Sequence, residues 1–98
     1  MDDQSFRDRV QEHADSVVRG DMDAVTNDFA AGMRPQVPQI AQALPQPVRS
    51  AEVLSTRAGD TVSQAEIRYT GDDRAVTIRS NWQEEDGRLV LVHAEPTG

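Results

Sequence analysis

The sequence predicts an α+β fold in which N-terminal helices pack on a four-stranded antiparallel sheet. Two observations predict it. Apolar residues recur at helical spacing up to residue 31, and the pattern changes to strand-like alternation over residues 48–95. Helices followed by strands are typical of α+β domains, whose helices cover one face of the sheet. With 98 residues the chain has the size of one domain, so residues 1–98 are expected to share one core.

Residues 3–31 are predicted to form two helices joined by a bend. One apolar stripe at helical spacing marks residues 3–19: Phe6, Val10, Ala14, Val17 and Val18. Gly20 ends this helix. Asp21 is expected to cap a second helix over residues 22–31, because its carboxylate can accept the free amides of the next turn.

Residues 32–47 hold four of the five prolines and are predicted to contain a short helix from Gln39 to Leu44. Pro38 suits the first position of a helix, where its missing N–H is not needed, and Pro45 would end the helix. The alternative is a partly ordered linker across the mouth of the domain.

Four strands are predicted at residues 48–57, 61–70, 75–84 and 89–95, since these segments are rich in β-branched and aromatic residues and are separated by Gly and Asp. If Asp72-Asp73 and Asp86-Gly87 occupy the centres of their turns, the opposed residues follow, and opposed residues share a face. The expected pairs are Tyr69–Val76, Ile67–Ile78, Ala65–Ser80, Ser63–Trp82, Glu84–Leu89, Trp82–Leu91, Ser80–His93 and Ile78–Glu95.

The net charge of −7 argues against a nucleic-acid partner and against an anionic membrane surface. The absence of cysteine excludes disulfides and thiolate chemistry. No apolar stretch approaches the roughly 20 residues that cross a bilayer, and the first ten residues have no signal-peptide core. A cytoplasmic protein is therefore expected.

The core is thin, because Leu, Ile, Val and Phe together make up 20 of the 98 residues. The domain is therefore expected to be either a marginal monomer or a homodimer. The expected contact surface is the outer sheet face, where the register places Val90, Val92 and Ala94.

Two segments of the chain resemble the nuclear transport factor 2-like superfamily, which includes ketosteroid-isomerase-like and SnoaL-like proteins. The first runs from His13 through the Gly20-Asp21 bend to Phe29-Ala30, and the second is the hairpin formed by residues 76–94. Together they cover about half of the chain. The resemblance implies a cone-like α+β barrel, in which a curved sheet wraps around the helices and leaves a pocket inside.

The resemblance also implies positions for a site. His13 falls where the isomerases carry a tyrosine that binds the oxyanion, and Ser80 falls near their protonated acid. The segment that carries their general-base aspartate is replaced here by the proline-rich residues 32–47, so steroid isomerisation is disfavoured.

His13 and His93 are the candidate acid–base groups, because imidazole exchanges protons near neutral pH. His93 opposite Ser80 suggests an activated hydroxyl, with Glu95 the only acid placed to orient the imidazole. A structural role is the alternative for each histidine. Two histidines eighty residues apart predict no metal site, and the chain has no glycine-rich phosphate loop, so no cofactor is expected.

Tyr69 and Trp82 are expected to line a pocket together with His13 and His93, with simple core packing as the alternative. The leading functional prediction is a domain that binds a small, largely apolar molecule in the cone. The alternatives are a small acid–base enzyme of the isomerase, cyclase or dehydratase type, and a non-catalytic interaction module with a filled cone. An enclosed cavity of about 300 Å³ or more would favour ligand binding.

Overall fold

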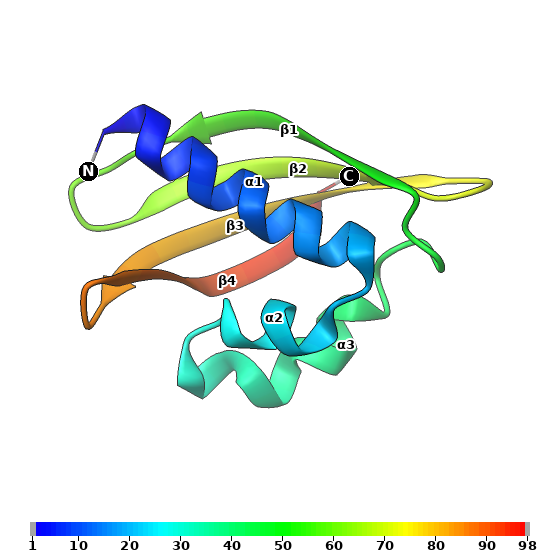
Figure 1. Ribbon diagram of the computed structural model, residues 1–98, viewed down its shortest axis with the longest axis horizontal. Helices are drawn as coiled ribbons and strands as arrows, with labels where there is room; N and C mark the ends of the chain where they lie inside the picture. The colour runs from blue at the N-terminus through cyan, green and yellow to red at the C-terminus, as the bar shows by residue number, and fades with distance from the viewer. Residues whose placement is uncertain (1, 98) are drawn as a thin grey trace.

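The computed structural model describes residues 2–97 and has two layers, helices on one face of an antiparallel sheet (Figure 1). The elements are α1 (Asp3–Arg19), α2 (Met22–Asn27), the 3-10 helix η1 (Ala31–Gln36), α3 (Val37–Ala41), β1 (Ser50–Arg57), β2 (Ser63–Thr70), β3 (Ala75–Glu85) and β4 (Arg88–Thr97). The strands lie in the order β1-β2-β3-β4, and the sheet is open rather than closed into a barrel. The α+β fold with helices before the sheet is confirmed.

Helix α1 begins and ends at the predicted residues. The Asp2 carboxylate accepts the backbone N–H of Ser5 at 2.7 Å. Gly20 ends the helix in the left-handed conformation, with φ of 73°, and its N–H returns to the last carbonyls of the helix. The face that α1 buries against the sheet consists of Phe6, Val10, His13, Ala14, Ser16 and Val17.

Helix α2 is shorter than predicted. Asp21 caps it as expected, accepting the N–H of Ala24 at 3.1 Å. The helix ends at Asn27, and the next residues pair with β4: the N–H of Leu91 donates to the carbonyl of Asp28, and the N–H of Ala30 donates to that of Leu91, both at 2.8 Å. These long-range bonds replace the last helical turn, and they hold Asp28 beside the sheet.

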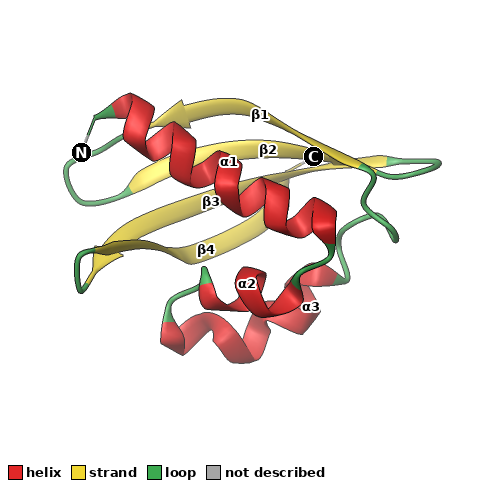
Figure 2. Cartoon of the chain, viewed as in Figure 1, coloured by secondary structure: helices red, strands yellow, loops and turns green. Residues whose placement is uncertain are grey.

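The proline-rich segment is ordered. It forms η1 and then α3, with Pro38 in the first turn of α3, so the predicted short helix exists but starts and ends earlier. Figure 2 shows these short helices gathered beside α2, on the side of β4. Val37 is buried there, and Ile40 and Leu44 pack against the core.

The predicted pairing of β2 with β3 is confirmed in full, from Tyr69 opposite Val76 to Ser63 opposite Trp82. The β3–β4 hairpin also begins as predicted. Asp86 and Gly87 form its turn, with φ of 53° and 79°, and Glu84 lies opposite Leu89.

Beyond Trp82 and Leu91 the predicted register is wrong. Trp82 pairs with Leu91, but Asn81 pairs with His93, so Val92 is an extra residue on β4. The bulge places Ala94 opposite Ser80 and Pro96 opposite Ile78, where His93 and Glu95 were expected. One extra residue moves the following side chains to opposite faces, so His93 turns outward and Ala94 turns inward.

The core lies between α1 and the inner sheet face. Trp82, Phe6 and Val10 are fully buried at its centre. The outer face differs from the prediction, because Val90 is buried and Ala94 packs against the core, which leaves only Val92 half-buried. The homodimer stays a prediction, without the apolar outer patch that suggested it. Within residues 2–97, no helix is long and apolar enough to cross a membrane.

Candidate functional site

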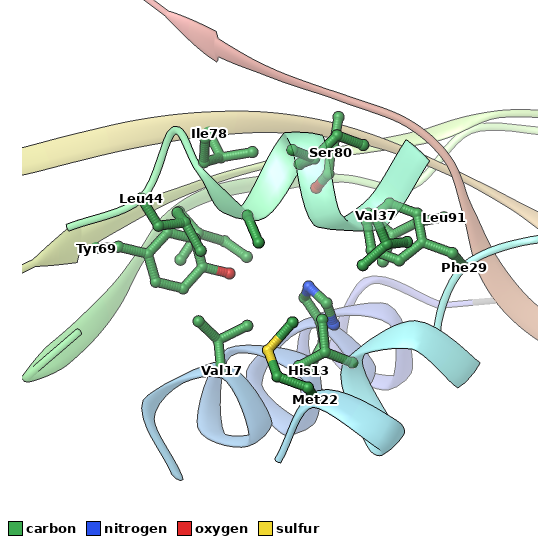
Figure 3. A pocket seen from close by; sticks show the side chains of 15 residues that line it. His13, Val17, Met22, Phe29, Val37, Leu44, Tyr69, Ile78, Ser80 and Leu91 are labelled. Carbon is green, nitrogen blue, oxygen red and sulfur yellow. The ribbon is translucent and has the colours of Figure 1, made fainter. Parts of the chain in front are cut away.

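A cavity of about 50 Å³ lies between the helices and the inner face of the sheet (Figure 3). Its lining comes from α1, α2, α3 and all of the strands except β1: His13, Val17, Met22, Val25, Phe29, Val37, Ile40, Ala41, Leu44, Ile67, Tyr69, Ile78, Ser80, Leu91 and Ala94. The cavity is far smaller than the ligand pockets of about 300 Å³ and more that drug-sized molecules need. Since a cavity needs about 10–15 Å³ by this kind of measure to hold one water, the space suits a molecule of only a few heavy atoms.

The structure brings three of the predicted site residues, His13, Tyr69 and Ser80, to the wall of this cavity. Trp82 stands behind the wall, where its ring packs edge-on against Phe6 and His13. Trp82 therefore has the alternative role, simple core packing, and does not line the pocket. His93 lies outside, with half of its side chain exposed and its Nε2 at 3.5 Å from Glu95.

His13 forms a buried pair with Asp28. Its Nδ1 lies 2.7 Å from Oδ2 of Asp28, and both side chains are less than one-tenth exposed. Helix α1 places His13 on its sheet-facing side. Helix α2 ends at Asn27, and the chain that follows brings Asp28 next to His13. Because Nδ1 is engaged by the carboxylate, the other ring nitrogen points into the cavity, as Figure 3 shows.

The Asp28 carboxylate is held ionised. Burial alone would raise its pKa, but the hydrogen bonds from His13 and Arg9, together with the positive charge beside the carboxylate, outweigh burial and keep the pKa below its usual value. Arg9 Nη2 lies 2.9 Å from Oδ1, and Arg88 Nη2 lies 3.5 Å from the same oxygen.

Arg9 is itself fixed from three sides. Its Nε and Nη2 donate to the carbonyl of Leu89 at 3.2 and 3.1 Å, and Nη2 also donates to Asp28. Its guanidinium carbon stands 5.3 Å from the centre of the Trp82 ring, which is cation–π distance. The series of contacts Arg9–Asp28–His13 thus connects the first half of α1 to the cavity wall.

Tyr69 faces His13 across the cavity, with its hydroxyl pointing inward (Figure 3). Burial, and to a lesser degree the charge of Asp28, raise the pKa of Tyr69, so the hydroxyl stays protonated. No hydrogen bond joins this hydroxyl or Nε2 of His13 to another residue within 2–97, and both atoms are open to the cavity. They are the groups through which the cavity can bind a polar atom.

Ser80 is already engaged. Its Oγ donates to the carbonyl of Ala65 at 3.3 Å and accepts the indole N–H of Trp82 at 2.9 Å. The predicted pairing of Ser80 with His93 does not exist, because the bulge in β4 takes His93 to the other face. Ser80 therefore anchors Trp82 and offers no activated hydroxyl.

Sequence reasoning missed Arg9 and Asp28. A signal for them was present, because Arg9 and His13 stand four residues apart beside an otherwise apolar stripe of α1. Buried polar side chains need hydrogen-bond partners, and a buried cation such as Arg9 calls for an acidic one. Nothing in the sequence, however, shows which of the 17 acidic residues supplies it.

Among the described residues, no group of three His, Cys, Asp or Glu side chains lies close enough to hold a metal ion. Comparison of the chain with protein-family models, with curated proteins and with solved structures finds no match. No relative therefore assigns a role to His13, Asp28 or Tyr69.

Proposed function

We propose that this domain binds a small, largely apolar molecule in the cavity between the helices and the sheet. One observation carries the proposal: His13 Nε2 and the Tyr69 hydroxyl face an apolar cavity without a partner in residues 2–97. A ligand that bonds to both groups gains hydrogen bonds there, each worth about 1 kcal/mol. The apolar wall contributes burial of the rest of the ligand.

We propose further that the domain is related to the nuclear transport factor 2-like superfamily. A nuclear transport factor 2-like domain would have a sheet wrapped around its helices like a cone, with a ligand pocket inside. The order of helices before four antiparallel strands supports the relationship, and so does a cavity at the inner sheet face.

Acid–base catalysis is the second candidate, and the His13–Asp28 pair favours it. A carboxylate that holds Nδ1–H leaves Nε2 as a base aimed at the ligand, which is the arrangement of a general base with its orienting acid. A protonated Tyr69 could stabilise negative charge on a ligand oxygen. Such a site would suit proton abstraction beside a carbonyl group, as in isomerases and dehydratases.

The third candidate, an interaction module with a filled cone, is supported by the small volume of the cavity. It differs from the first candidate, ligand binding, in predicting no saturable ligand binding.

NMR titration of the ¹⁵N- and ¹³C-methyl-labelled protein separates these two candidates. The probes are alcohols and ketones of about four heavy atoms, since about 50 Å³ admits little more. We expect saturable shifts at cavity methyls such as Val17 and Leu91.

A matched pair of variants controls this titration. Ala41→Leu fills the cavity from α3, whereas Ala43→Leu adds the same atoms two residues further on, outside the cavity. Ala41→Leu is expected to abolish the shifts, and Ala43→Leu to leave them unchanged. Shifts that survive in Ala41→Leu, or that never saturate in the wild type, would contradict the proposed function.

A further inference from the structure

The Asp28 carboxylate already has a close positive partner before His13 is counted. Arg9 pairs with Asp28 at 2.9 Å, and half-exposed Arg88 approaches the same oxygen at 3.5 Å. Glu12 lies 3.5 Å from Arg9, but it is three-quarters exposed and contributes little to the buried charges. The buried carboxylate thus meets one close and one more distant cation without any charge on the imidazole.

This pairing bears on the charge of His13. A second buried positive charge beside a single buried carboxylate would lack a counter-charge, and uncompensated buried charge is costly. Neutral His13 avoids that cost and still donates Nδ1–H to Asp28 at 2.7 Å. In this tautomer Nε2 carries a lone pair and can only accept a hydrogen bond.

The opposite wall offers the complementary group. The Tyr69 hydroxyl is protonated and points into the same space as His13 (Figure 3). A ligand atom between them must donate to Nε2 and can accept from Tyr69. A hydroxyl group does both, a carbonyl does only the second, and a carboxylate also meets the negative charge of Asp28 in an apolar setting.

We propose that the cavity selects small neutral molecules that carry a hydroxyl group, which donates to Nε2 of His13 and accepts from the hydroxyl of Tyr69. Arg9 is the positioning residue for this preference, since it supplies the close positive charge that keeps His13 neutral. The inference rests on the proposed function and names the ligand class of that site.

Three probes of equal heavy-atom count test the preference: 2-propanol, acetone and acetate. Each is titrated at pH 8 into the labelled protein, and the dissociation constant is taken from the shifts of cavity methyls. One hydrogen bond is worth about a fivefold change in affinity, so 2-propanol should bind about fivefold more tightly than acetone, and acetate should not saturate. Equal affinity of 2-propanol and acetone, or tighter binding of acetate, would overturn the inference.

The outcomes separate this inference from the proposed function. Saturable binding of all three probes without preference would overturn only the inference. No saturable shift from any probe would overturn the proposed function, and the inference with it.

Two variants test the roles of the residues. Tyr69→Phe should weaken 2-propanol binding about fivefold, because one hydrogen bond is lost while the ring remains. The control His93→Ala, at the exposed histidine, should bind as the wild type does. Unchanged affinity in Tyr69→Phe would contradict the assigned contact.

Arg9→Met tests the positioning role. With the close cation gone, the arrangement that leaves Nε2 as an acceptor loses its support, so the preference for 2-propanol over acetone should be lost. Arg9→Lys, which keeps the charge, should retain the preference for 2-propanol. A preference for 2-propanol that survives in Arg9→Met would show that Arg9 does not set the state of His13.

Discussion

Replacing Asp28 with asparagine keeps the shape of the side chain and removes its charge. In the wild type, Asp28 pairs with Arg9 at 2.9 Å, and their side chains are 8% and 15% exposed. The variant leaves Arg9 as a buried cation without a counter-charge. Breaking a buried ion pair from one side costs about 3–5 kcal/mol. Because Arg9 keeps its bonds to the Leu89 carbonyl, we expect the lower end, about 3 kcal/mol.

The measurement is unfolding by urea and by heat, each followed by the fluorescence of Trp82 and by far-UV circular dichroism. For a domain of this size, about 3 kcal/mol corresponds to a fall in melting temperature of roughly 12–24 °C. The matched control is Asp72→Asn. Asp72 also lies 2.9 Å from an arginine, Arg49, but both side chains are more than 60% exposed. An exposed pair of this kind contributes little, so the control should unfold like the wild type.

The reasoning is refuted if Asp28→Asn lies within about 1 kcal/mol of the wild type, or if Asp72→Asn is destabilised as much. The pH dependence gives a second test. The pKa of Asp28 is lower in the folded protein than the ordinary value of 3.8, so its contribution to stability is fully present above 3.8. The gap between wild type and Asp28→Asn should therefore shrink only as the pH falls below 3.8 and through the lowered pKa.

Three further predictions concern single side chains. Tyr69→Phe should change the free energy of unfolding by less than about 0.5 kcal/mol in urea titrations, because the hydroxyl has no partner among residues 2–97; a loss above about 1.5 kcal/mol would reveal one. His93→Ala should leave the melting temperature unchanged, since His93 is exposed and outside the core. A clear fall in melting temperature would indicate that His93 lies on the inner face of the sheet. Gly20→Ala should cost about 1 kcal/mol in thermal unfolding, because φ is 73° and a Cβ there meets no atom within 4 Å, so only backbone strain acts. A neutral Gly20→Ala would contradict the left-handed cap.

The sheet register could be predicted from the sequence as far as the turns control it. Two turn assignments gave the whole β2–β3 pairing and the first part of the β3–β4 pairing. The bulge at Val92 could not be predicted, because Val90, Leu91 and Val92 are all apolar and fit either face. The error moved His93 into the predicted site and Ala94 out of it.

The candidate site was predictable only in part. His13 and Tyr69 follow from helical and strand periodicity, and both line the cavity. Asp28 could not be found in this way, because its position depends on backbone bonds to Leu91, which is 63 residues further along the chain. Periodicity describes one element at a time, whereas this pair joins the end of one helix to the face of another.

The state of the His13 ring nitrogens tests the central claim most directly. Long-range ¹H–¹⁵N NMR correlation at pH 8 distinguishes a protonated from an unprotonated ring nitrogen and distinguishes both tautomers from the imidazolium. We predict a neutral ring with the proton on Nδ1, facing Asp28, and an unprotonated Nε2, facing the cavity. A proton on Nε2, in either the other tautomer or the imidazolium, would contradict the account.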